Sequence, residues 1–119
     1  MSNQISIISI FSARALRYRA ALHLYESVLM GFRRELGDAQ PETRKTAHDM
    51  ANLYYNHGVA HYYRQRYEAA LDRYGRALTV MSEHFGEEHA SLAKILKNMG
   101  RVVCSCVASN DAHWSALYV

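Results

Sequence analysis

Apolar and aromatic residues recur every three or four positions along most of this chain, which is the spacing of one face of an α-helix. The clearest stripe begins after Tyr67 and consists of Ala70, Leu71, Tyr74, Ala77, Leu78 and Met81. A second helical pattern precedes it around Gly58, and the polar pair Gln65 and Arg66 separates the two. The sequence therefore predicts two helices joined by a short turn in the middle of the chain.

The stripe occurs twice. Residues 17–36 read RYRAALHLYESVLMGFRREL, and residues 66–85 read RYEAALDRYGRALTVMSEHF. The packing residues correspond in order, with Tyr18, Ala21 and Tyr25 in the first copy matching Tyr67, Ala70 and Tyr74 in the second. A glycine follows each copy, as is common where a helix ends. We expect small residues, among them Ala77, at close contacts between helices, with the tyrosines filling the space beside them.

A further correspondence relates the middle of the chain to its C-terminal part. Gly58 and Gly100 are 42 positions apart (100 − 58), and Asn56 and Asn98 have the same separation. We therefore predict one all-α domain over residues 1–119, built from about two and a half helix hairpins with units near 4–36, 42–84 and 89–118. The individual helices are expected near 4–14, 16–35, 42–65, 67–84, 89–107 and 110–118.

These features resemble the tetratricopeptide repeat, in which a small residue in the first helix precedes a tyrosine at the turn and an alanine–aromatic–alanine series in the second helix. In this chain those places hold Gly58, Tyr67, Ala70, Tyr74 and Ala77. The spacing near 42 and the LG and FG loops are similar to the kinesin-light-chain type of this repeat. The resemblance implies an antiparallel α-solenoid that serves as a scaffold for protein–protein interaction.

The resemblance also implies a binding surface. In the family, an asparagine at the place of Asn56 and Asn98 faces the concave groove and hydrogen-bonds the backbone of an extended peptide, to which an amide offers both donor and acceptor. The neighbouring basic residues Lys94, Lys97 and Arg101 suit an acidic peptide. A partner helix is another candidate for the groove. The alternative for the two asparagines is an ordinary solvated or interhelical role.

Composition fits a globular protein and does not favour nucleic acid as the partner. Half of the residues are hydrophobic and 21% are charged, with a formal net charge of +3. The basic run Arg64–Arg76 is kept as a remote candidate for nucleic-acid binding, because such runs are more often a solvated helix face. No apolar run approaches the roughly 20 residues that a membrane span needs.

The polar residues do not predict an enzyme, a cofactor or a metal site. His57 and His61 share a helix face and could bind zinc, but packing among the neighbouring tyrosines is the simpler interpretation. Cys104 and Cys106 are two positions apart, which does not suit a metal pair, and they favour a reducing, cytoplasmic setting. The acid-free, arginine- and serine-containing start of the chain is also the composition of a mitochondrial transit peptide.

Both ends of the chain carry apolar residues without an evident cover. Repeat arrays need polar caps, because each unit buries its apolar surface only against a neighbour. The sequence therefore predicts self-association through either end, and the alternative function is a structural subunit or homo-oligomer whose repeat surface is buried in an assembly. The candidate residues are Ile5, Ile8, Phe11, Trp114 and Leu117.

Overall fold

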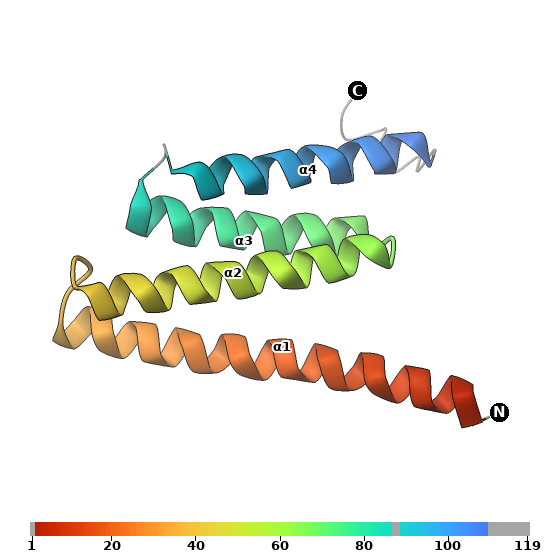
Figure 1. Cartoon of the computed structure of the whole chain (residues 1–119), viewed down its shortest axis with the longest axis horizontal. Coiled ribbons are helices and arrows are strands. Elements are labelled where there is room, and N and C mark those ends of the chain that lie inside the picture. Colours follow the sequence, from red (N-terminus) through yellow and green to blue (C-terminus); the bar gives the residue numbers. More distant parts are fainter. Residues whose placement is uncertain (1, 87–88, 110–119) are drawn as a thin grey trace.

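The computed structural model describes the backbone of residues 2–86 and 89–109, and the side chains of residues 16–86 and 89–109. Every regular element in this part of the chain is an α-helix, as the apolar spacing predicts (Figure 1). The helices are α1 (Ser2–Glu35), α2 (Pro41–Tyr63), α3 (Tyr67–Phe85) and α4 (Ala90–Ala108). The all-α prediction is confirmed.

Successive helices lie side by side and run in alternating directions, so the described chain is an open stack of helix hairpins (Figure 1). The hairpin of α2 and α3 forms the centre, with α1 against one side of α2 and α4 against α3. Side chains of α2 also reach α4, as in the contact of Tyr55 with Asn98. The stack therefore has one surface shared by α2 and α4 and another that involves α1 and α3.

Small side chains let α2 and α3 approach each other closely. Ala47 on α2 and both Ala70 and Ala77 on α3 are fully buried in the main apolar core. At Gly58 a β-carbon would lie 2.7 Å from Cε1 of Tyr74, a distance that real side chains do not adopt. The close contact of the two helices at this point therefore requires glycine.

The first helix differs from the prediction. We expected two helices near 4–14 and 16–35, whereas α1 is one continuous helix from Ser2 to Glu35. No glycine or proline interrupts the intervening residues Ser12–Arg17, and Ala13, Ala15 and Leu16 are strong helix formers. The first unit is therefore a single long helix rather than a hairpin. The helix predicted at 110–118 lies outside the described residues.

Helix ends follow local signals in the sequence. Pro41 occupies the first turn of α2, where its missing N–H costs no intrahelical bond. Gly86 ends α3 with φ 81° and ψ 170°, a conformation essentially restricted to glycine. Gly37, at the matching place after α1, also has a positive φ of 88°. Among the described helices, none combines the length and the apolarity that a membrane span requires.

We expect that Ala70→Leu overpacks the contact between α2 and α3 and lowers the free energy of unfolding by about 1–3 kcal/mol. Ala70 is fully buried, so the additional side-chain carbons have no open space to occupy. Urea unfolding followed by circular dichroism measures the change. An unchanged midpoint would contradict this arrangement of the two helices.

Candidate functional site

The surface shared by α2 and α4 is held together by a polar contact centred on Tyr55. The amide nitrogen of Asn98 donates to the Tyr55 hydroxyl at 2.6 Å and to the backbone carbonyl of Lys94 at 3.1 Å. The Lys94 ammonium lies over the Tyr55 ring, 4.5 Å from its centroid, in a cation–π contact. Asn98 therefore fixes the spacing of the two helices with its amide nitrogen, and the carbonyl oxygen of the same amide is not used in these contacts.

A second polar contact and a small pocket complete this surface. The hydroxyls of Tyr62 on α2 and Ser105 on α4 lie 2.9 Å apart and share a hydrogen bond. Beside Tyr55 is a pocket of about 40 Å³, large enough for the tip of one small side chain. Its lining comes from three helices and consists of His48, Ala51, Asn52, Tyr55, Met81, Ser91, Lys94 and Ile95.

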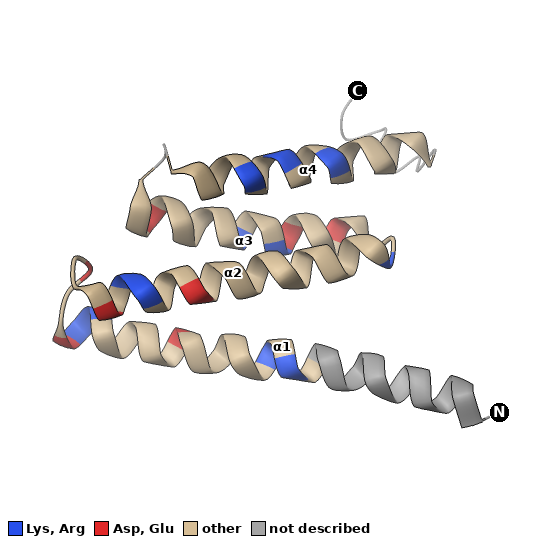
Figure 2. Cartoon of the chain, in the orientation of Figure 1, with Lys and Arg blue, Asp and Glu red and all other residues tan. Residues whose placement is uncertain are grey.

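The predicted groove residues fall into two sets. Asn98 and Lys94 meet at Tyr55, as described above. Asn56, Lys97 and Arg101 are exposed, and the basic residues of α4 are spaced along that helix (Figure 2). The structure thus places Asn98 between helices, with Asn56 available to solvent.

Tyr55 is the central residue of this surface and is not among the site residues predicted from the sequence. The prediction named Asn56, Asn98 and the nearby cations, because the resemblance directs attention to the asparagines. A signal was present: His48, Asn52, Tyr55, Val59 and Tyr62 recur at four- and three-residue steps. That second stripe on α2 marks the face that a further helix contacts.

The residues predicted to pack between repeats differ in their burial and contacts. Tyr18 of α1 stacks on His57 of α2, with ring centroids 4.4 Å apart, and Tyr25 and Tyr67 lie against the core. Ala21 is half-buried. No described residue lies within 4 Å of a β-carbon built at Gly100. The packing role of Gly100 stays a prediction.

The histidine pair lies where α1, α2 and α3 meet. His57 is buried, and its ring centroid is 4.5 Å from that of His61. Burial, together with the positive charges of the nearby His61, Arg73 and Arg19, lowers the pKa of His57 to about 4. The positive charges of these arginines make this a poor setting for a metal cation. Among the described residues, no group of three or more potential metal ligands occurs.

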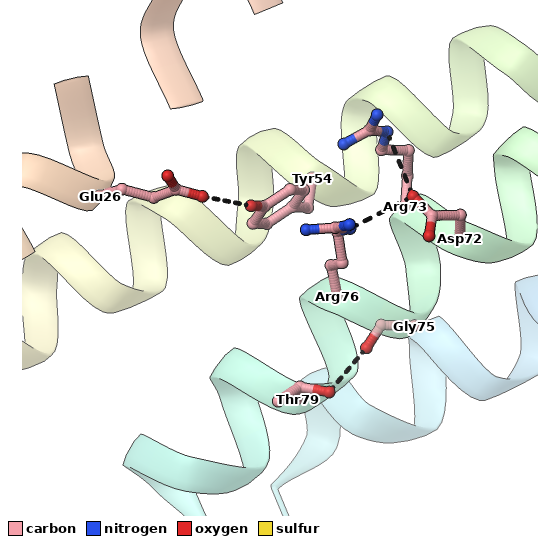
Figure 3. Close-up of polar contacts among 7 residues, drawn as sticks. All are labelled: Glu26, Tyr54, Asp72, Arg73, Gly75, Arg76 and Thr79. Atoms are coloured by element: carbon pink, nitrogen blue, oxygen red, sulfur yellow. Dashed lines mark hydrogen bonds and ion pairs between the residues drawn. The ribbon is translucent and has the colours of Figure 1, made fainter. Parts of the chain in front are cut away.

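The basic run Arg64–Arg76 does not form one continuous cationic face. Arg73 and Arg76 both approach the carboxylate of Asp72, at 3.6 and 3.2 Å (Figure 3). Close by, the Tyr54 hydroxyl donates to Glu26 of α1 at 3.0 Å, which links α1 to α2 (Figure 3). Burial raises the pKa of Tyr54, and Glu26 adds to that shift. Acidic residues thus neutralise part of this surface and weaken it as a nucleic-acid site.

The residues predicted to drive self-association lie outside the described side chains. Ile5, Ile8 and Phe11 belong to the backbone of α1, but their side chains are not described. Trp114 and Leu117 fall beyond residue 109. Of the two cysteines, Cys104 is exposed and Cys106 is buried, and both are free thiols.

Comparison with known proteins agrees with this geometry. Residues 49–106 match the family model of the tetratricopeptide repeat, a range that runs from within α2 through α3 to near the end of α4. No protein with a curated description matches the chain. The kinesin-light-chain subtype stays a prediction. Repeats of this family typically act as non-catalytic scaffolds for protein–protein interaction, and the match places the segment 49–106 among the tetratricopeptide repeats.

Proposed function

We propose that the surface shared by α2 and α4 binds an extended, acidic segment of a partner protein. The observation that supports this proposal is the Tyr55–Asn98–Lys94 contact, which holds two helices at a fixed spacing and leaves polar groups on their exposed faces. A peptide laid between the helices meets Asn56 from α2 and the Asn98 carbonyl oxygen from α4. Each of these amides can pair with a backbone peptide group.

The positive charge of α4 determines which class of peptide this surface favours. Lys94, Lys97 and Arg101 lie within two turns of α4, and all three are exposed with no ion pair among the described residues. Cations of this kind steer acidic segments toward the groove and reject basic ones. The binding is expected to weaken as salt concentration rises, because exposed charges are screened.

The experiment uses immobilised libraries of extended octapeptides, one rich in aspartate and glutamate and a matched one rich in lysine and arginine. We expect the chain to retain acidic peptides selectively. Against a selected peptide, Asn56→Ala/Asn98→Ala should weaken binding by roughly 5- to 100-fold, because each lost hydrogen bond costs about 0.5–1.5 kcal/mol. Fluorescence anisotropy measures the affinity.

Controls separate binding from folding. Asn56 is exposed, so Asn56→Ala tests the groove without disturbing the core, whereas Asn98→Ala also removes the partner of the Tyr55 hydroxyl. Unfolding curves therefore accompany each variant. Thr79→Ala, an exposed change on α3 beside Glu26 and Arg76, should leave the affinity unchanged. Equal affinity of the parent and the Asn56→Ala variant, or retention of both libraries alike, would refute the proposal.

A further inference from the structure

The solvent-exposed side of α1 carries apolar side chains that the described residues leave largely or partly uncovered. Leu24 is 64% exposed and Val28 is 45% exposed, whereas Leu22 and Leu29 on the inner face are buried. In Figure 1, α1 forms one edge of the stack and has α2 on one side only. Exposed apolar residues in a row on one helix face are typical of an interaction surface.

Leu24 and Val28 fit the spacing of a coiled-coil seam, whereas the exposed Leu16 and Met30 lie off it. Starting at residue 17, steps of four, three, four, three and four positions along α1 select one face of the helix. We call this set the α1 seam, and it consists of Arg17, Ala21, Leu24, Val28, Gly31 and Glu35. Ala21 is half-buried and the other five are exposed. The seam is basic at its N-terminal end, apolar in the middle and acidic at its C-terminal end.

This order makes the seam complementary to a second copy of itself in the antiparallel direction. About a two-fold axis at residue 26, Leu24 of one copy faces Val28 of the other, and Arg17 faces Glu35. Ala21 and Gly31 form the remaining pair. Apolar residues thus face apolar residues, small residues face small residues, and each charged residue faces one of opposite charge. A two-fold symmetric contact requires a surface that is complementary to itself in this way. A parallel pair would instead place Arg17 against Arg17 and Glu35 against Glu35.

Two local features indicate that another helix can pack against this face of α1. A β-carbon at Gly31 would meet nothing within 4 Å, so the backbone is open to close approach by a neighbouring helix. Arg17 and Glu35 have no ion-pair partner among the described side chains, whereas Arg33, on the same helix, is paired with Asp38 at 2.7 Å. The charges at the two ends of the seam are therefore available to a partner.

We propose that two copies of this chain associate through their α1 seams, packed antiparallel about a two-fold axis near residue 26. The seam spans about 27 Å at 1.5 Å per residue. One helix pair of this length lies at the small end of specific interfaces, so the dissociation constant is expected on the order of micromolar. The seam is separate from the α2–α4 surface, and the association does not depend on peptide binding.

Sedimentation velocity of the whole chain from about 1 to about 100 µM tests the association. We expect a reversible monomer–dimer equilibrium, and Leu24→Arg should raise its dissociation constant at least about tenfold, because it places two like charges at the centre of the contact. Met30→Arg is the matched control. Met30 is 63% exposed on the same helix but is not a seam residue, so its substitution should leave the equilibrium unchanged.

A charge exchange tests the antiparallel register. Arg17→Glu and Glu35→Arg should each weaken the dimer about three- to tenfold, because symmetry places every altered pair twice in the contact. The double variant Arg17→Glu/Glu35→Arg should restore the parent affinity, which a variant that merely misfolds would not do. A monomer throughout the concentration range would overturn the proposal. Association insensitive to Leu24→Arg, or a double variant no tighter than the single ones, would do the same.

Discussion

Replacing Tyr74 by alanine is expected to lower the free energy of unfolding by about 3–5 kcal/mol. Tyr74 is 1% exposed and is the largest fully buried side chain in the described part of the chain. Its ring lies against Gly58 of α2 and has its centroid 5.5 Å from that of Tyr55. Truncation therefore leaves a cavity at the centre of the α2–α3 hairpin. Urea unfolding followed by circular dichroism measures the loss, which is a large part of the about 5–15 kcal/mol typical of a domain.

The same ring explains why position 58 holds glycine, and a double-mutant cycle tests the explanation. With Tyr74 present, Gly58→Ala should destabilise the protein, because the new methyl group would lie 2.7 Å from the ring. In the Tyr74→Ala background, Gly58→Ala should instead stabilise by up to about 1 kcal/mol, since alanine is the better helix former. The expected reversal of sign identifies the contact as the cause.

Gly75→Ala is the matched control for that cycle. Gly75 also lies within a helix, but nothing is within 4 Å of the position of its β-carbon. The substitution should therefore stabilise by up to about 1 kcal/mol whether or not Tyr74 is present. If Gly58→Ala had the same effect in both backgrounds, contact with Tyr74 would not be the reason for glycine at that position.

The features that could be predicted from the sequence depend on nearby residues. Pro41 and Gly86 mark helix ends through backbone conformation alone, and the structure has α2 begin and α3 end at these signals. The alanine and aromatic series of α3 likewise follows from helical spacing within a few turns. The matched family model and the all-helical structure confirm the fold class drawn from these signals.

The features that could not be predicted depend on residues far apart in the sequence. Tyr54 and Tyr55 are adjacent aromatic residues, yet Tyr54 bonds Glu26 of α1 and Tyr55 bonds Asn98 of α4. The positions of α1 and α4 determine which neighbour each tyrosine contacts. The spacing of residues within α2 does not predict these positions. The sequence therefore predicts a binding face on α2 and α4 but not the tyrosine at its centre.

Lowering the pH from 7 to 5 is expected to destabilise the protein by about 2 kcal/mol through His57 alone. Burial lowers the pKa of His57 in the folded state to about 4, from an ordinary value of 6.5. Below pH 6.5 the unfolded chain therefore binds a proton that the folded chain does not, and stability falls until the pH reaches about 4. Over that whole window the loss is about 3 kcal/mol, at 1.36 kcal/mol per pKa unit.

The surroundings of His57 explain why a proton is unfavourable there. Tyr18 of α1 covers one face of the imidazole, and the neighbouring His61 on α2 is also titratable. Arg73 of α3, Arg19 of α1 and Arg64, which directly follows α2, lower the pKa of His57 through their positive charges. A protonated His57 would add one more charge to this group at the contact of α1 with α2. We therefore expect the packing of α1 on α2 to weaken first as the pH falls.

His57→Phe separates this contribution from other titrating groups. Phenylalanine keeps an aromatic ring for Tyr18 to stack on but cannot bind a proton, so the variant should lose about 2 kcal/mol less than the parent between pH 7 and 5. Urea unfolding at the two pH values measures the difference. Titrating groups far from position 57 contribute equally in both proteins and cancel in the comparison. An equal loss in the parent and the variant, or an NMR titration that places the pKa of His57 near 6.5, would contradict the prediction.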